Sequence, residues 1–400
     1  MAQATGTEGR SVVVPGIDAP STVACVRSLG RRGIRTIVVS SDETTPAARS
    51  TYCDEFVLAK SPHDDLISYK DTLLALASRP DVDAIIPVRE PDIYALSKYR
   101  AEFREHVRTP WPEMETLAAV QDRVRLFEAA DAADVAAPRT TLFETVPDGD
   151  GEWIVKPRFS VLGDEYVDGL QPETCIAPPS TRYLDSTDPP DVEAIHEEMS
   201  HVPVVQEFVD TPDEYGFFAL YDEGEPLATF QHRQRRGYRY TGGPSAYRES
   251  VEIPALESAG RSLLDHLEWH GLAMVEFLRD ESTGEFKLME INPRFWSSLP
   301  FSIQTGADFP LYYWLLANGR ADHIDHDYRT AIGGHLIRGE LCYLYSILSC
   351  DVGIVDKPRL TDAVLDVGRT TIDQPRFDYL SRDDPLPFVR DCLNTLESIR

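Results

Sequence analysis

The hydrophobic pattern of the first 112 residues predicts alternating strands and helices. Three short apolar runs have the length and residue types of strands, and three amphipathic segments that follow them have the period of helices. The strands are Ser11–Val14, Ile34–Val39 and Ala84–Val88, and the helices are Thr22–Leu29, Leu66–Ser78 and Pro91–Phe103. This order is typical of a parallel sheet with helices on both faces, so we predict a small doubly wound α/β domain.

The rest of the chain has strands that follow one another with fewer helices between them. A helix is predicted at Thr116–Ala130, and the final segment, 326–400, is mostly helical in pattern. The other predicted strands are Glu152–Lys156, Val204–Val209, Tyr215–Tyr221 and Pro226–Gln231, and the other helices are Val192–Met199, Ala255–Trp269 and Pro310–Ala317. The fold class is therefore α/β, with an α+β core in the second half.

The pattern between Gly271 and Leu299 predicts a β-hairpin. Two apolar runs, Met274–Leu278 and Glu285–Ile291, are joined by a turn that contains Asp280, Ser282 and Gly284. Acidic residues stand inside these apolar runs, where an ordinary surface hairpin would not place them. We therefore expect their side chains to have a specific role.

The polar residues of this hairpin have the chemistry of a magnesium site. Glu276 lies on the first strand, and Glu290 and Asn292 lie on the second, so their side chains can converge on one patch. Carboxylate and amide oxygens are hard ligands that suit Mg²⁺, whose remaining ligands come from water and phosphate. Arg294 follows two residues later and offers five donors to a phosphoryl or carboxylate group. A metal clamp beside an arginine is typical of phosphoryl transfer.

The charge balance narrows the class of partner. The formal net charge is −28, and only six of the 39 basic residues are lysines. Such an acidic chain is not expected to bind nucleic acid, which requires a positive surface. An acidic, lysine-poor composition is similar to that of halophilic proteins, in which molar salt screens self-repulsion. An acidic protein of a non-halophilic cell is the alternative.

Several other classes are disfavoured by what the sequence lacks. It contains no apolar run of about 18 residues, so we expect no membrane span. Its opening residues have no basic stretch followed by an apolar one, so we expect no secretory signal. The six cysteines have no metal-site or C-x-x-C spacing, which is simplest in a reducing cytoplasm. The glycine fingerprint G-x-G-x-x-G is missing after the first strand, which disfavours a dinucleotide-dependent oxidoreductase.

The hairpin resembles the metal-binding end of ATP-grasp ligases, the superfamily of D-alanine–D-alanine ligase, biotin carboxylase and carbamoyl-phosphate synthetase. Their pattern is an acidic residue on one strand and Glu-x-Asn on the next, which Glu276, Glu290 and Asn292 match. The resemblance implies ATP and Mg²⁺ as cofactors, with Mn²⁺ as an alternative ion, and these three residues as metal ligands.

The resemblance extends to the nucleotide side. Lys156, in the strand-end sequence V-K-P, and Arg123, on the preceding helix, match positions that contact phosphates. The strand V-V-Q-E-F-V matches the hinge to the adenine, which assigns nucleotide contacts to Gln206, Glu207, Phe208 and Val209. Glu214 matches a carboxylate that holds the ribose hydroxyls, although the register between Asp213 and Glu214 is open. The alternative is that Lys156 is a solvated lysine at a strand end, Arg123 a surface arginine and Glu214 a surface glutamate.

The lid departs from the superfamily pattern. Where its members have a glycine-rich loop over the phosphates, this chain has Pro157–Gly169, with glycine only at positions 163 and 169. Backbone cradling of phosphate needs residues that allow close approach. We therefore expect a remodelled lid loop, or one that stays open until substrate arrives.

The segment Phe230–Ser250 gathers six cationic or titratable side chains in an otherwise acidic chain: His232, Arg233, Arg235, Arg236, Arg239 and Arg248. Such a cluster favours an anionic ligand over chance, with a solvated basic stretch as the alternative. We expect Arg294 and Arg235 to neutralise an acyl phosphate and His232 to be a candidate general base. The turn Thr241–Ser245 is expected to be flexible, with amides free to approach a carboxylate.

The sequence motifs of Phe230–Ser250 and Asn292–Leu299 closely resemble those of a subfamily of predicted carboxylate–amine ligases within the ATP-grasp superfamily. The implied parts are an N-terminal pre-ATP-grasp domain at 1–112, a linker helix and lid at 113–205, an ATP-grasp core with the metal site at 206–325, and a helical extension at 326–400. The implied activity joins a small carboxylate to an amine through an acyl phosphate, and we allow for a homodimer. Bicarbonate or a thiol as acceptor, or a nucleotide-binding module without catalysis, remain alternatives.

Overall fold

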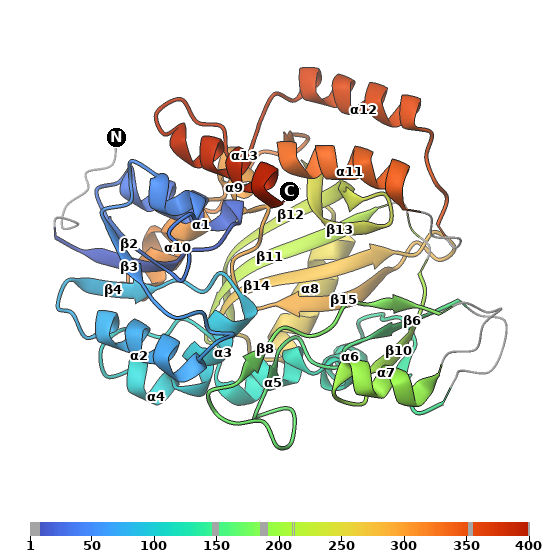
Figure 1. Ribbon diagram of the computed structural model, residues 1–400, viewed down its shortest axis with the longest axis horizontal. Helices are drawn as coiled ribbons and strands as arrows, with labels where there is room; N and C mark the ends of the chain where they lie inside the picture. Colours follow the sequence, from blue (N-terminus) through green and yellow to red (C-terminus); the bar gives the residue numbers. More distant parts are fainter. Residues whose placement is uncertain are drawn as a thin grey trace.

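The N-terminal segment folds into a four-stranded sheet in the computed structural model, which describes residues 9–145, 152–184, 191–209, 211, 213–350 and 355–398 (Figure 1). The strand order is β3-β2-β1-β4, all parallel. The bounds are β1 Ser11–Pro15, β2 Arg35–Ser40, β3 Glu55–Leu58 and β4 Val82–Ile85. Val12, Val13 and Val14 are fully buried, as expected of a strand covered on both faces.

Helices cover both faces of this sheet. They are α1 (Pro20–Gly30), the short 3₁₀ helix η1 (Pro46–Arg49), α2 (Leu66–Ala77), α3 (Glu90–Lys98) and α4 (Arg100–Phe103). The predicted doubly wound domain is confirmed, although sequence reasoning missed β3 and merged α3 with α4. Tyr99 separates these two helices with non-helical backbone angles.

The predicted helix at Thr116–Ala130 is wrong as a single element. The structure contains two helices, α5 (Met114–Gln121) and α6 (Arg123–Ala132). Asp122 separates them in an extended conformation, and its carboxylate accepts a hydrogen bond from the Val124 amide at 3.0 Å. Arg158 also binds the Asp122 carboxylate, at 2.7 and 2.9 Å. The break places Arg123 at the start of a new helix, which points it toward the core.

A small antiparallel sheet follows, in the order β5-β10-β6-β9. Its strands are β5 (Thr140–Leu142), β6 (Trp153–Lys156), β9 (Arg182–Tyr183) and β10 (Val204–Glu207), and helix α7 (Val192–Met199) packs on it with the predicted bounds. Two short strands, β7 (Leu162–Gly163) and β8 (Cys175–Ile176), pair separately. Strand β10 spans the domain boundary that the sequence predicts at residue 205.

The largest sheet has the order β15-β14-β11-β12-β13-β16, with antiparallel neighbours throughout. Its strands are β11 (Glu214–Asp222), β12 (Glu225–Arg239), β13 (Gly242–Ser250), β14 (Gly271–Arg279), β15 (Phe286–Asn292) and β16 (Gly333–His335). The predicted hairpin is confirmed as β14 and β15. The expectation of a flexible turn at Thr241–Ser245 is wrong, because Gly242–Ser245 belongs to β13.

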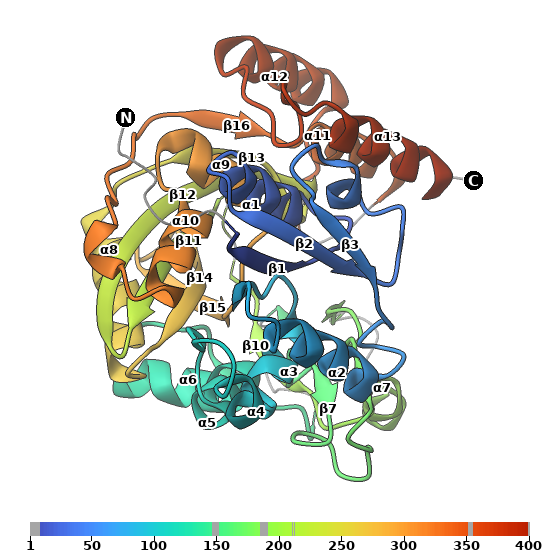
Figure 2. The ribbon, with the colours of Figure 1, turned by 90° about the vertical axis from the view of Figure 1, so that its left-hand side faces the viewer.

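Helices tie the large sheet to its neighbours. Helix α8 (Pro254–His266) packs on β11 and β15, where Gly260 lies so close to Phe217 that a Cβ atom would stand 2.2 Å from the ring. Helices α9 (Leu299–Thr305) and α10 (Phe309–Ala317) lie toward the N-terminal domain (Figure 2). Tyr313 of α10 donates to the Ile85 carbonyl oxygen at 2.9 Å, which links core and N-terminal domain.

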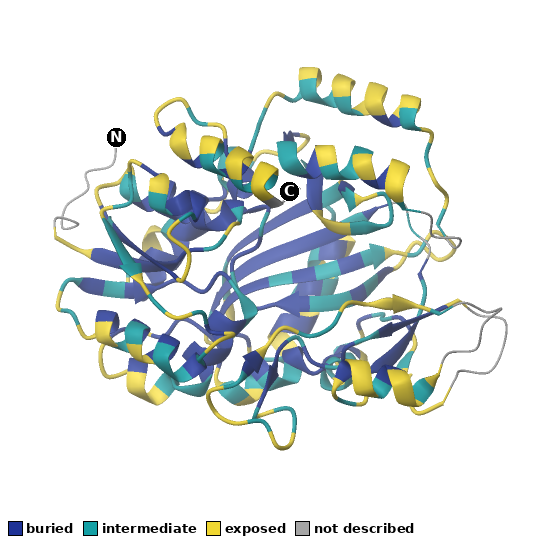
Figure 3. Ribbon diagram, viewed as in Figure 1, coloured by how far each residue is buried: buried dark blue, intermediate teal, exposed yellow. Residues whose placement is uncertain are grey.

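The C-terminal segment is helical as predicted, apart from β16, which joins the large sheet. Between β16 and α10 lies a short 3₁₀ helix, η2 (Ala321–His323). Helices α11 (Ile337–Ser349), α12 (Leu360–Asp373) and α13 (Leu386–Ser398) follow, and Figure 3 shows exposed residues along all three. Among the described residues, no helix has the length and apolar character needed to cross a bilayer.

Candidate functional site

The site is built on one face of the large sheet. Glu276 on β14 stands directly opposite Glu290 on β15 and, on its other side, opposite Gly216 on β11. Residues opposite each other in an antiparallel pair project to the same face, and so does a residue two positions along the strand. Glu214, two residues before Gly216, therefore shares this face with both carboxylates.

Asn292 connects the two carboxylates. Its Nδ2 donates to Glu276 Oε1 and to Glu290 Oε1, both at 3.0 Å. Its Oδ1 accepts from Arg294 Nη2 at 2.7 Å. The structure thus brings together all four polar residues that the hairpin sequence singled out.

Two cations from outside the sheet complete the group. Arg123, at the start of α6, donates through Nη2 to Glu290 Oε2 at 2.8 Å. Lys156 ends β6, and its Nζ donates to Gln206 Oε1 at 2.8 Å. Gln206 is fully buried and also donates to Thr140 at 2.9 Å. Gln206 therefore orients Lys156, whereas the sequence assigned it a contact with the nucleotide.

Burial makes the ionisation of this group unusual. It raises the pKa of Glu276 well above its ordinary value, and the charges of Glu290 and Glu214 add to the effect. Burial opposes ionisation of Glu290 as well, but Arg123 and Asn292 outweigh it and lower that pKa. Burial and the charge of Arg123 lower the pKa of Lys156 to about 7. The group therefore holds unbalanced charge that a polyanion and a cation together would compensate.

The residues expected around the nucleoside lie beside this group. Strand β10 ends at Glu207, and Phe208 and Val209 follow it. The Val209 amide has no hydrogen bond within the described residues. The Glu207 carboxylate lies 3.6 Å from Lys287 Nζ, and Phe208 contacts Tyr183 edge to face. Burial raises the pKa of Glu214 to about 7, and Gln234 donates to its carboxylate at 2.7 Å.

The lid loop Pro157–Gly169 is docked on the N-terminal domain. Tyr94 donates to Asp164 at 3.0 Å, and Lys98 forms an ion pair with the same carboxylate. A Cβ atom at Gly163 would stand 2.5 Å from the Tyr94 hydroxyl oxygen. Glycine at this position is therefore explained by close packing against α3.

His232 does not reach the group of polar side chains. It is 3% exposed and packs against Phe218, with ring centroids 4.7 Å apart. Burial, reinforced by the charge of Arg248, lowers the pKa of His232 to about 3. An imidazole that gains a proton only at this acidity is a poor base at neutral pH, so the structure argues against the catalytic role expected from the sequence.

The arginine cluster is also distributed differently from the expectation. Arg233 and Arg235 both pair with Asp213, on the face opposite Gln234 and Glu214. Arg236 pairs with Glu340 at 2.8 Å, and the fully buried Arg248 pairs with Asp378. The pairs of Arg236 and Arg248 attach the C-terminal segment to the large sheet. The anionic partners of these four arginines are therefore carboxylates of the chain itself.

Sequence reasoning missed Glu90. It begins α3, and its Oε1 accepts from Arg294 Nε at 2.8 Å, while its Oε2 accepts from Gln121 Nε2 at 2.8 Å. Burial raises the pKa of Glu90, although Arg294 and Gln121 oppose the rise. The available signal was an acidic residue just past the apolar run Ala84–Val88, because sites in parallel sheets form at the carboxyl ends of strands.

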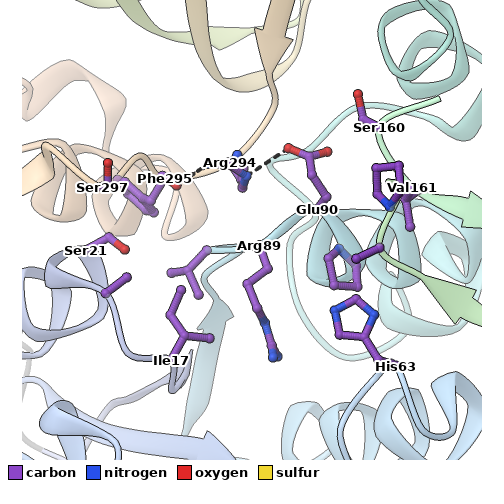
Figure 4. Close-up of a pocket in the computed structure, with 15 residues that line it drawn as sticks. Ile17, Ser21, His63, Arg89, Glu90, Ser160, Val161, Arg294, Phe295 and Ser297 are labelled. Carbon is purple, nitrogen blue, oxygen red and sulfur yellow. Dashed lines mark hydrogen bonds and ion pairs between the residues drawn. The ribbon is translucent and has the colours of Figure 1, made fainter. Parts of the chain in front are cut away.

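A cavity of about 380 Å³ lies where the N-terminal domain, the lid loop and the core meet. Figure 4 shows Glu90 pointing to Arg294 at its edge, with Ser21, His63, Val161 and Phe295 around it. The cavity thus adjoins the end of the polar group at which Arg294 holds Asn292.

The donor set fits a magnesium ion that is shared with phosphate. No three His, Cys, Asp or Glu side chains converge as a closed metal site among the described residues. Two facing carboxylates and one amide leave most positions to water and phosphate, which is how Mg²⁺ is usually held. The amide of Asn292 now turns its nitrogen to both glutamates, so presenting oxygen to a metal requires a flip of that amide.

No protein-family model matches the sequence, and no curated protein shows significant sequence similarity to it. Solved structures do match. An N5-carboxyaminoimidazole synthetase from Staphylococcus aureus superposes with a TM-score of 0.58 over 83% of each chain, at 14% identity. An L-amino acid ligase from Bacillus licheniformis gives a TM-score of 0.59 at 13% identity, over 81% of this chain and 78% of its own.

A third match is the biotin carboxylase domain of the 2-oxoglutarate carboxylase from Hydrogenobacter thermophilus, which was solved with MgADP and bicarbonate. Its TM-score is 0.60 at 14% identity, over 81% of this chain and 73% of its own. At such identities the likeness establishes the fold. The chain has the ATP-grasp fold, as the sequence motifs implied.

Proposed function

We propose that the chain is an ATP- and Mg²⁺-dependent ligase that activates a carboxylate as an acyl phosphate and joins it to an amine. One observation carries the proposal: Glu276, Glu290 and Asn292 form a hydrogen-bonded unit, in an ATP-grasp fold, beside Arg123 and Lys156. This unit has the ligands for Mg²⁺ and the cations for phosphate on adjoining elements.

The nucleotide would be held along β10 and β11. The Val209 amide, which has no hydrogen bond within the described residues, would bind the adenine edge, and Glu214 would accept from both ribose hydroxyls. Lys156 and Arg123 would bind the phosphates. Mg²⁺, held by Glu276, Glu290 and Asn292, would supply charge neutralisation at the transferred phosphoryl group.

The protein's own contribution would be positioning and charge. Arg294 would hold the substrate carboxylate next to the phosphoryl group, and its guanidinium would balance the charge of the acyl phosphate. Holding two reactants in contact accounts for about 7–11 kcal/mol of barrier reduction in favourable cases. Arg235 is kept out of this mechanism, because it pairs with Asp213 on the other face of the sheet.

Alternative acceptors remain open proposals. Among the similar structures, the L-amino acid ligase is named for ligation of amino acids, which supports an amine, whereas the carboxylase domain was solved with bicarbonate. A thiol acceptor has no specific support in the site. A nucleotide-binding module without catalysis would share every nucleotide contact but would not release phosphate.

The test is ATP-dependent phosphate release at molar KCl, with and without Mg²⁺, across pools of carboxylates and amines. Glu290→Gln is the loss-of-function variant, and Glu249→Gln on β13 is the matched control. Substrate-dependent release by the wild type that disappears in Glu290→Gln supports the ligase. Tight binding of Mg·ATP without release in any pool would favour the non-catalytic module, and no ATP binding would reject the proposal.

We further propose that the chain forms a homodimer through its C-terminal helices. Ten of the fifteen large hydrophobic side chains exposed in the described residues lie on α11, α12 and α13. Together they offer an apolar area on the order of the ~800 Å² per partner that a stable interface buries. Two copies that each carry a net charge of −28 repel elsewhere, so an apolar face is where they can meet.

Two statements about the cell stay predictions. All six cysteines are free, which is compatible with a reducing cytoplasm. The acidic, lysine-poor composition predicts maximal stability and activity at high salt. Both justify testing the protein under reducing conditions in molar KCl.

A further inference from the structure

The arginine cluster is not the expected acceptor site, because four of its arginines pair with carboxylates of the chain itself. Arg294 lines the cavity between the N-terminal domain, the lid loop and the core, and it also contacts Asn292, one of the three proposed metal ligands. A molecule in this cavity would therefore lie next to the carboxylate that Arg294 holds. The cavity has a volume of about 380 Å³, which is enough for a small molecule.

The walls of the cavity are mostly apolar. Ile17, Val88, Val161 and Phe295 contribute from the N-terminal domain, the lid loop and the core. Of the described residues that line it, Glu90 alone carries a carboxylate, and it stands at the edge next to Arg294 (Figure 4). Two guanidiniums also line the cavity, but each already has a carboxylate partner: Arg294 pairs with Glu90, and Arg89 pairs with the buried Asp92 at 2.8 Å. The apolar walls suit a ligand with a small apolar body, and the Glu90 carboxylate suits one ammonium group.

Glu90 is held in a fixed orientation. Arg294 anchors one carboxylate oxygen, and Gln121 anchors the other; Tyr166 in turn donates to Gln121 at 2.7 Å. Each oxygen accepts a single hydrogen bond from these neighbours, so each has a further lone pair for a donor in the cavity. The carboxylate is therefore positioned to bind an ammonium group next to the activated carbonyl.

An amine needs a base before it can attack. At neutral pH it is an ammonium ion, which has no lone pair on nitrogen. His232 is enclosed in an aromatic cluster and is not among the residues that line the cavity, whereas His63, on the loop before α2, is a histidine that does line it. His63 Nδ1 lies 2.8 Å from the Cys175 carbonyl oxygen, and Figure 4 shows Glu90, not His63, directed to Arg294.

We propose that this cavity binds a primary amine with a small apolar body and that Glu90 is the general base for its attack. The inference rests on the proposed ligase function and specifies its acceptor site. The ammonium gives one proton to the Glu90 carboxylate, and the freed nitrogen lone pair attacks the acyl carbon. The bond from that carbon to the phosphate oxygen breaks, and its electron pair leaves with phosphate, which accepts the second proton from nitrogen. The products are the amide, hydrogen phosphate and protonated Glu90, which then returns its proton to water.

The test compares two nucleophiles with the full-length protein. Hydroxylamine is neutral at pH 7 and needs no base, whereas propylamine and isobutylamine are ammonium ions. Each is added with Mg·ATP and the carboxylate pool, and hydroxamate and amide are quantified by mass spectrometry. Glu90→Gln keeps the size of the side chain and an oxygen that can accept from Arg294. Glu102→Gln, on α4 and paired with Lys70, is the control.

We expect Glu90→Gln to form hydroxamate within about threefold of the wild-type rate and to lose amide formation by about 10²–10⁴-fold, the usual contribution of a general base. Glu90→Asp should recover part of the amide rate. Equal loss of both products, with a native melting temperature, would show that Glu90 only positions Arg294 and would overturn the base. Unchanged amide formation would overturn it as well.

The outcomes also separate this inference from the function on which it rests. If the wild type forms hydroxamate and neither alkylamine is converted, the ligase function stands and the amine site is rejected. If the wild type forms neither product while it binds Mg·ATP, the ligase function is rejected, and the acceptor site with it.

Discussion

Glu276 and Glu290 stand directly opposite each other on β14 and β15, and one Asn292 amide group bonds to both. Within the described residues, Glu290 forms an ion pair with Arg123 at 2.8 Å, and Glu276 forms none. The two carboxylates therefore differ: the pKa of Glu276 is raised by burial and by its neighbour's charge, and the pKa of Glu290 is lowered by Arg123 despite burial. A divalent cation between them would remove the repulsion.

This asymmetry predicts opposite effects on stability for two variants that both lose activity. Glu276→Gln should raise the melting temperature of the free protein at pH 8 by a few degrees, because burial and neighbouring charge oppose ionisation of the Glu276 carboxyl in the folded state but not in the unfolded state. Glu290→Gln should lower it, because Arg123 loses its partner. Both should reduce phosphate release by at least about 100-fold. Differential scanning fluorimetry and the phosphate assay test this pair, and equal shifts in melting temperature would contradict the asymmetry.

A second prediction concerns Glu214, because burial raises the pKa of its carboxyl from the ordinary 4.5 to about 7. The folded state binds this proton more tightly than the unfolded state, so the carboxylate costs stability as the pH rises from 4.5 through 7. Glu214→Gln should therefore be more stable than the wild type at pH 8, by on the order of 3 kcal/mol, and nearly equal to it at pH 4.

Urea unfolding at both pH values measures the Glu214 effect, and nucleotide titration measures its functional cost. ATP affinity should fall in Glu214→Gln, because an amide cannot accept from both ribose hydroxyls as a carboxylate can. A variant that gains no stability at pH 8 would show that Glu214 is not a buried charge. A variant that keeps full ATP affinity would remove Glu214 from the nucleotide site.

Lys156 supports a third prediction, because burial and Arg123 lower its pKa to about 7. At pH 8 the free protein holds it mostly as the neutral amine. Nucleotide phosphates favour the ammonium form, so ATP binding at pH 8 without Mg²⁺ should take up as much as about one proton. Calorimetry in two buffers of different ionisation enthalpy counts the proton. Lys156→Met should bind ATP more weakly and take up none, and equal uptake in this variant would assign the proton to another group.

The sequence predicted the parts of the site that lie close together along the chain. Glu276, Glu290, Asn292 and Arg294 fall on one hairpin, so strand alternation alone placed them together. Glu90 lies 204 positions from Arg294, and only the packing of two domains brings them into contact. The single helix predicted over Asp122 failed for a related reason. Arg158, from a later strand end, holds the Asp122 carboxylate and stabilises the break.

The basic segment shows how composition can mislead. Its arginines were expected to meet a ligand, but Arg248 meets Asp378, which lies 130 positions further along the chain. No local pattern signals that pairing. In a chain with 67 acidic residues, an arginine can find its carboxylate within the fold.

A fourth prediction follows from that pair. Arg248 and Asp378 are both buried, so Arg248→Ala leaves a buried carboxylate without its cation and should cost about 3–5 kcal/mol of unfolding free energy. Arg235→Ala is the matched control on the same pair of strands. Its side chain is 39% exposed and should cost less than about 1 kcal/mol. Urea unfolding in molar KCl compares the two variants, and similar losses of unfolding free energy would contradict the larger contribution of the buried pair.

The homodimer gives the last prediction. Leu365 and Ile372 of α12 are 72% and 80% exposed, and Ala363 is the only residue of this helix that is buried. Replacing both with aspartate should therefore leave the monomer folded and separate the dimer, because each new charge would be buried at the interface. Leu58→Asp, on β3 at 61% exposure, is the control and should leave the dimer intact. Light scattering on a sizing column in molar KCl measures the mass. A wild-type monomer would reject the dimer, and a double variant that stays dimeric would place the interface away from α12.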